Sequence, residues 1–108
     1  MNSSGGVTQN YTQKLLIKLE NSKKEIKQYI SIAQTGRIGK SGVFQIGEKR
    51  QCSARFEFTE SWSGSWEMSC NDQATANGRF TLDDKTKVTL GTGSTSFGGD
   101  VTFKMERL

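Results

Sequence analysis

Apolar and polar residues alternate one by one along most of the chain from Gly42 onward, which is the pattern of β-strands that bury one face. The clearest run is "CSARFEFT", residues 52–59, whose apolar face consists of Cys52, Ala54, Phe56 and Phe58. Residues 64–70 repeat the pattern, and the intervening "ESWSG" is short, polar and contains glycine. We therefore predict a β-hairpin over residues 52–70.

One register of this hairpin creates favourable contacts on both faces. If Cys52 lies opposite Cys70, the other cross-strand pairs are Ala54 with Met68, Phe56 with Trp66, and Arg55 with Glu67. These pairs place a small residue beside a large one, an aromatic beside an aromatic, and opposite charges together. We predict a disulfide bond between Cys52 and Cys70, with two reduced, buried thiols as the alternative.

Further strands are expected on either side of this hairpin. The apolar positions that alternate in the later segments are Gly78, Phe80 and Leu82, then Val88 and Leu90, and finally Val101, Phe103 and Met105. The intervening "GTGSTSFGGD", residues 91–100, is rich in glycine and is predicted to be a loop. Proline is absent from the chain, so glycine, Asn and Asp set the reversals.

Residues 12–34 fit two structures. They alternate as two strands around a turn at Asn21–Ser22, but Ser22 and Glu25 also form a capping box, and Gly36 could end a helix. We favour strands, because β-branched residues recur here and a barrel needs more strands than the rest of the chain supplies. A helix over residues 22–34 stays open as the alternative.

The chain of 108 residues is short, and only 32% of its residues are hydrophobic, which suits one domain with a thin core. We expect a disordered tail over residues 1–10 and a single all-β domain over residues 11–108. The expected fold is an antiparallel meander of about seven or eight strands that forms a small barrel or a compact sandwich with one disulfide.

Charge is distributed unevenly along the chain, whose formal net charge is +4. Residues 1–55 carry ten Lys and Arg against three Asp and Glu, and residues 56–108 carry five against eight. This asymmetry indicates either a surface that faces a polyanion or two solvated faces that attract each other. A polyanion-binding barrel would use the basic residues Lys14, Lys18, Lys27, Arg37, Lys40, Lys49 and Arg50.

Trp62 is the aromatic residue we single out for binding, because it lies on a polar turn where a large ring needs a partner. Phe56, Phe58 and Trp66 point inward by the parity of their strands. The candidate binding residues are therefore Trp62, Arg37, Lys40, Lys49 and Arg50.

Several chemistries lack their usual residues. The chain has no histidine, so the commonest general base and every Ser-His or Cys-His arrangement are missing. Two cysteines without histidine make a poor zinc site. Gly39-Lys40-Ser41 matches the end of a phosphate-binding loop, but the required earlier glycine is replaced by Gln34. We expect no enzymatic activity, no metal site and no cofactor.

The succession "GVFQIGEKRQCSARFEFTESWSGSWEMSC", "ATANGRFTL" and "GTGSTSFGGDVTFKM" resembles small secreted or lipid-anchored bacterial β domains of unknown function, over roughly residues 36–105. The chain departs from their pattern after the second cysteine, where it has "CNDQ". The resemblance implies a periplasmic, cell-surface or secreted protein. Because residues 1–10 do not have the regions of a secretory signal, this localisation assumes a removed leader.

These observations predict a non-catalytic binding or scaffolding module of the bacterial envelope. Its partner would be another envelope protein or a glycan, and a transmembrane span is not expected, because no apolar run reaches about 18 residues. The alternative is a small β-barrel that binds a polyanion, either nucleic acid or a glycan, although we expect nucleic acid less than a glycan.

Overall fold

The computed structural model describes residues 7–20 and 24–108. Over these residues the chain forms nine strands and no helix. The strands are β1 (Thr8–Leu19), β2 (Glu25–Thr35), β3 (Ile38–Ser41), β4 (Phe44–Ile46), β5 (Arg50–Glu60), β6 (Ser63–Cys70), β7 (Thr75–Leu82), β8 (Thr89–Thr95) and β9 (Gly99–Arg107). The prediction of strands in residues 12–34 is confirmed where the chain is described, whereas the predicted Asn21–Ser22 turn lies outside the described residues.

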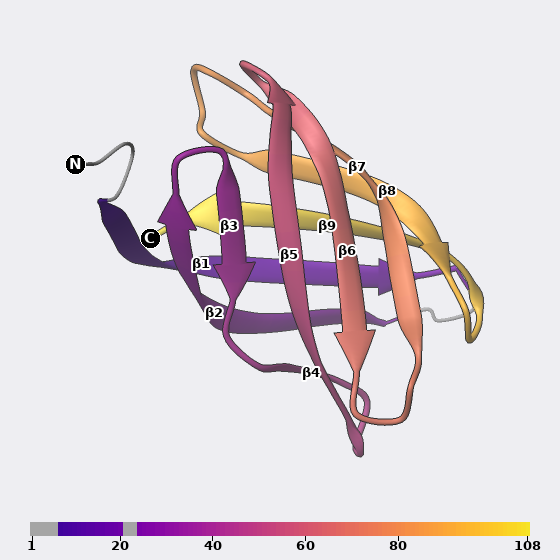
Figure 1. Ribbon diagram of the computed structural model, residues 1–108. Helices are drawn as coiled ribbons and strands as arrows, with labels where there is room; N and C mark the ends of the chain where they lie inside the picture. The colour runs from indigo at the N-terminus through magenta and orange to yellow at the C-terminus, as the bar shows by residue number, and fades with distance from the viewer. Residues whose placement is uncertain (1–6, 21–23) are drawn as a thin grey trace.

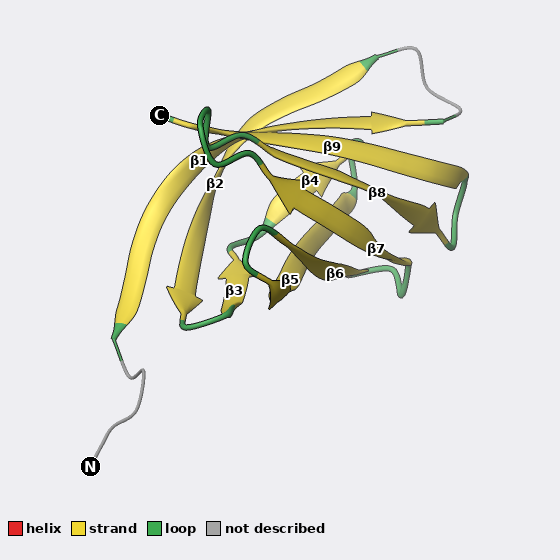
Figure 2. Cartoon of the chain, turned by 90° about the horizontal axis from the view of Figure 1, so that it is seen from above, coloured by secondary structure: helices red, strands yellow, loops and turns green. Residues whose placement is uncertain are grey.

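The strands form a closed antiparallel barrel, which decides between the two predicted architectures. Neighbours run in the order β3, β2, β1, β9, β8, β7, β6 and β5, and β3 also pairs with β5, so eight of the described strands make a ring. The short β4 is an extra strand that pairs with the start of β5. Figure 1 shows the strands crossing at an angle, and Figure 2 shows the sheet curling back on itself.

The predicted hairpin register is confirmed residue by residue. Cys52 pairs with Cys70, Phe56 pairs with Trp66, and the remaining predicted pairs also hold. Cys52 and Cys70 form a disulfide bond. The register shifts between Phe58 and Glu60, where a β-bulge precedes the turn into β6.

Inside the barrel, aromatic rings lie opposite glycines of neighbouring strands. These cross-strand pairs are Phe56 with Gly39, Phe80 with Gly64, Trp66 with Gly78, and Phe103 with Gly91. A Cβ atom at Gly39 would overlap the ring of Phe56, and one at Gly91 would overlap the ring of Phe103. Alternating large and small residues in this way lets the rings fit inside a small barrel.

Three sequence predictions need correction. Residues 91–100 are not a loop, because Gly91–Thr95 belong to β8 and Gly99 begins β9. A Cβ atom at Gly91 or Gly93 would overlap an inner ring, whereas Gly99 has a φ of 84° at the turn between β8 and β9. Leu90 is 54% exposed and points outward, while Thr89 takes the inner position. Residues 8–10, assigned to a disordered tail, pair with residues 33–35 of β2.

Candidate functional site

The barrel encloses a cavity of about 250 Å³. Its deep wall is apolar and includes Leu15, Ile30, Phe44, Met68 and Val101, all of them buried. The lining residues that remain exposed to solvent lie where β1 begins, where β9 ends and at the turn between β7 and β8. The cavity therefore opens at the upper left of Figure 1, where β1 begins and β9 ends.

The open end has a polar rim. The hydroxyl of Tyr11 donates a hydrogen bond to Oε1 of Gln34 at 2.7 Å, and Nε2 of Gln34 donates to the carbonyl of Gly36 at 3.2 Å. Burial raises the pKa of the Tyr11 phenol, and the charge of Arg107 opposes that rise. Arg107 is therefore close enough to the rim for its charge to act on Tyr11.

Gln13 is a buried polar side chain with one unpaired atom. It lines the cavity on β1 between Tyr11 and Leu15 and is 6% exposed. Its Oε1 atom accepts no hydrogen bond from the residues that the structure describes. An unpaired buried amide oxygen costs about 1–3 kcal/mol, so this atom points to a missing donor.

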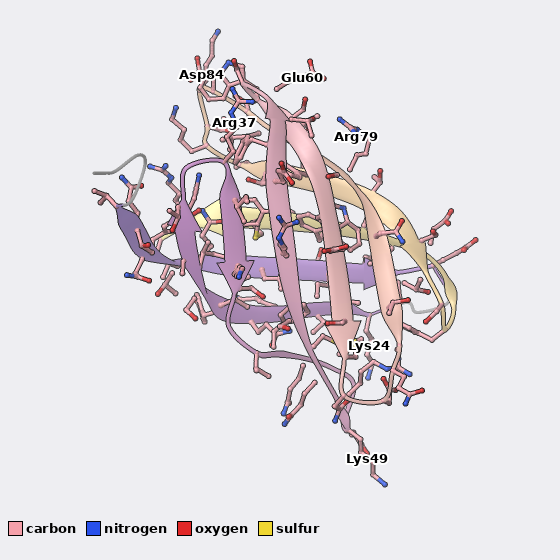
Figure 3. The ribbon with its side chains drawn as sticks, in the orientation of Figure 1. Lys24, Arg37, Lys49, Glu60, Arg79 and Asp84 are labelled. Carbon is pink, nitrogen blue, oxygen red and sulfur yellow. A yellow bond between two sulfur atoms is a disulfide. The ribbon has the colours of Figure 1, made fainter. Side chains whose placement is uncertain are left out.

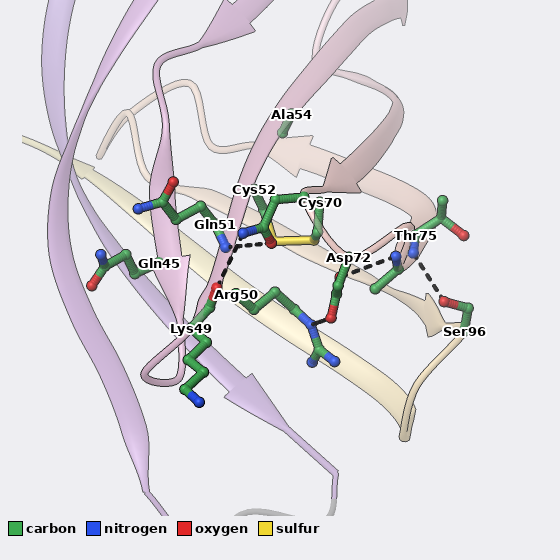
Figure 4. The surroundings of a disulfide bond; sticks show 12 residues. Gln45, Lys49, Arg50, Gln51, Cys52, Ala54, Cys70, Asp72, Thr75 and Ser96 are labelled. Atoms are coloured by element: carbon green, nitrogen blue, oxygen red, sulfur yellow. Dashed lines mark hydrogen bonds and ion pairs between the residues drawn. A yellow bond between two sulfur atoms is a disulfide. The ribbon is translucent and has the colours of Figure 1, made fainter.

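A network of interactions lies beside the disulfide at the opposite end of the barrel, and part of it is shown in Figure 4. Nε of Arg50 donates to a carboxylate oxygen of Asp72 at 2.8 Å, and its guanidinium lies over the ring of Phe97, 3.9 Å from the centroid. This hydrogen bond lowers the pKa of the Asp72 carboxyl. Cys52, at 2% exposure, lies beneath this network. The arrangement is typical of a structural cap.

The structure does not bring the candidate binding residues together in one site. Figure 3 places Arg37 and Lys49 at opposite ends of the barrel, and Arg50 is engaged by Asp72 and Phe97. Lys40 is exposed on β3. Arg37 and Trp62 do line one open depression near the cavity mouth.

Trp62 is 46% exposed on the turn between β5 and β6, as its polar surroundings predicted. The ammonium group of Lys87 lies 5.2 Å from the centroid of its ring. Lys87 also forms an ion pair with Asp84 at 3.0 Å. Because Lys87 lines the cavity mouth, Trp62 helps to position one wall of the opening.

Sequence reasoning missed Gln13, although the signal was present. The inner positions of β1 run Tyr11, Gln13, Leu15 and Ile17, so strict alternation already places one amide among apolar residues. A polar residue on an apolar face is the informative exception to the alternating pattern. Alternation predicts which side chains point inward, but it does not predict whether they fill the interior or leave a cavity.

The described residues hold no cluster of His, Cys, Asp and Glu that could bind a metal ion. Among them there is also no helix long and apolar enough to cross a membrane.

No protein-family model matches the chain, and no curated protein matches it. The chain is similar to a solved structure of a redesigned β-barrel, b11L5F_LGL, with a TM-score of 0.72 and 15% sequence identity. The alignment covers 91% of this chain and 90% of that chain. At this identity the likeness establishes the barrel fold and nothing about binding or activity.

Proposed function

We propose that this protein is a non-catalytic binding module that holds a small, largely apolar molecule inside its barrel. The observation that carries the proposal is the open-ended cavity with the unpaired Oε1 of Gln13 in its wall. Barrels of this size are wide enough to hold one small ligand. Apolar pockets with a few convergent polar groups are the usual form of small-molecule sites.

The volume limits the size of the ligand. A cavity of 150 Å³ accommodates benzene, so the 250 Å³ observed here suits a molecule of about ten non-hydrogen atoms in its buried part. A compact ligand of that size binds with a Kd of roughly 10–100 μM when its contacts are of ordinary efficiency. The proposal therefore concerns a small ring system or a short chain.

The compartment in the proposal is the periplasm, the cell surface or the medium. The disulfide between Cys52 and Cys70 supports an oxidising environment, because such bonds persist outside the reducing cytosol. The resemblance to secreted or lipid-anchored bacterial β domains supports the same assignment. A binding module of the envelope would capture its ligand from the surrounding medium.

The test is calorimetric titration with indole, a rigid bicyclic probe of suitable size. Ala54→Leu fills part of the cavity from β5, while Ser53→Leu adds the same side chain to the exposed face of that strand. We expect binding to the natural chain and to Ser53→Leu, and at least roughly tenfold weaker binding to Ala54→Leu. Equal binding to all three chains would place the site elsewhere and overturn the proposal.

A second candidate is polyanion binding by the outer face of β1 and β2. In their register Lys14 lies opposite Tyr29, which is 60% exposed, and Lys18 and Lys27 lie on the same outer face. An exposed ring among lysines suits a phosphate- or sulfate-bearing chain. Retention on heparin that disappears at moderate salt and in a Lys18→Gln/Lys27→Gln variant would favour this candidate. Salt-insensitive binding of the indole probe would favour the first.

A further inference from the structure

Gln13 and Arg107 lie directly opposite each other in the pairing of β1 with β9. Both side chains line the cavity, Gln13 inside the barrel and Arg107 at its exposed mouth. Residues in directly opposite positions have Cβ atoms about 4.5–5.5 Å apart. One small molecule can therefore contact both side chains at once.

The two side chains require different partners. The Oε1 atom of Gln13 is an acceptor. The nearby hydroxyl of Tyr11 already donates its hydrogen bond to Gln34, so the ligand must supply the donor for Gln13. Arg107 is a cation, and none of the ion pairs formed within residues 7–20 and 24–108 includes it. The other cation at the mouth, Lys87, is paired with Asp84. Arg107 is thus left for an acidic group.

The cavity wall is also rich in aromatic rings. Phe58 meets Phe80 edge to face with centroids 5.0 Å apart, and Trp66 meets Phe103 in the same way at 5.3 Å. All four side chains line the cavity. Ring edges and faces presented around a space of this size favour a flat aromatic guest over a flexible chain.

Resting on the proposed function, we propose that the ligand is a compact aromatic acid with a ring N–H or O–H group. The donor bonds Oε1 of Gln13, the ring occupies the aromatic part of the cavity, and the carboxylate lies at the mouth beside Arg107. This assignment accounts for the unpaired buried oxygen and for the position of the cation.

The donor is tested by calorimetry with indoleacetate and N-methylindoleacetate, which differ in the ring N–H. The natural chain should bind indoleacetate roughly tenfold more tightly, because methylation leaves the buried oxygen unpaired. In Gln13→Met, which keeps the length of the side chain but removes the acceptor, this preference should disappear. If Gln13→Met keeps the preference, the weaker binding of N-methylindoleacetate comes from the size of its added methyl group. That result would overturn the role given to Gln13.

The acidic group is tested with indoleacetate against indoleacetamide, which has nearly the same shape without the charge. The natural chain should prefer the acid by roughly threefold or more, and Arg107→Gln should lose the preference. Lys104→Gln also removes one positive charge from β9, but from its outer side, where the ammonium of Lys104 lies 3.6 Å from Glu106. This control should keep the preference for the acid.

The outcomes separate the two proposals. If none of these probes binds, the proposed function fails and the ligand assignment fails with it. If they bind inside the barrel with equal affinity, the cavity is a binding site but the aromatic-acid assignment is wrong. Each variant should have a urea midpoint at or above that of the natural chain. This measurement establishes that the binding comparison is made between folded proteins.

Discussion

The side chain of Gln28 pairs with the backbone of Gln45 as a neighbouring strand would. Its Nε2 donates to the carbonyl of Gln45 at 2.7 Å, and the backbone N–H of Gln45 donates to its Oε1 at 2.9 Å. The backbone pairing of β2 with β3 ends at Ser41, so no backbone pairing joins β2 to β4. The amide side chain of Gln28 therefore joins β2 to the extra strand β4 along the seam between these two strands.

Replacing Gln28 should weaken the barrel at this seam. Gln28→Ala removes both hydrogen bonds and is expected to lower the free energy of unfolding by about 1–3 kcal/mol, measured by urea denaturation. Gln28→Glu keeps the acceptor and loses the donor, so its effect should be smaller. Lys27→Ala, an exposed neighbour on β2, is the matched control. A loss for Lys27→Ala as large as that for Gln28→Ala would contradict the role given to this side chain.

The disulfide should make a large contribution to the free energy of unfolding. The sequence separation of Cys52 and Cys70 is 18, and closing a loop of that size contributes about 3 kcal/mol in the chain-entropy treatment. The double variant Cys52→Ala/Cys70→Ala should lose that amount in urea denaturation. Mass spectrometry on natively purified protein should find no free thiol. Two free thiols would remove the argument for an oxidising compartment.

Gly91 should not accept a side chain. Because a Cβ atom there would overlap the ring of Phe103, Gly91→Ala is expected to cost about 1–3 kcal/mol of stability. Shortening the ring in Gly91→Ala/Phe103→Leu should recover part of the loss, and the double-mutant cycle measures the coupling between the two positions. Strictly additive effects would show that the ring does not lie over this glycine.

The free energy of unfolding should fall at alkaline pH, and part of this fall should come from Tyr11. Burial raises the pKa of this phenol above the unfolded value of 10.0. The folded chain therefore holds the proton more strongly, and the associated stability is present below about pH 10 and is lost as pH rises through the folded pKa. Urea midpoints should decline less steeply between about pH 9 and about pH 11 in Tyr11→Phe. Tyr29→Phe, at an exposed position, should retain the natural slope.

Much of the fold follows from local pattern and cross-strand complementarity. The hairpin of residues 52–70 could be predicted in register, because two cysteines, an aromatic pair and an ion pair all agree on one alignment. The strands of residues 12–34 could be preferred but not separated from a helix, because the alternation supports strands while the capping box supports a helix. Local signals were sufficient wherever several of them pointed to the same partner.

The rest depends on contacts between segments that are distant in sequence. Gly91 and Gly93 resemble loop residues until the rings of Phe103 and Trp66 are known to lie against them. The cavity depends on how completely the inner side chains fill a closed ring, which alternation does not report. Gln13 was visible as a polar residue on an apolar face, but its unpaired oxygen is a property of the assembled barrel.

The most direct test of the account is nuclear magnetic resonance of the isotope-labelled protein with bound indole. Nuclear Overhauser effects should connect the probe to side chains of the deep wall, above all Leu15, Met68 and Val101, with shifts at the amide group of Gln13. Contacts confined to Tyr29 and its neighbouring lysines on the outer face, with the inner methyl groups unchanged, would contradict a binding site inside the barrel.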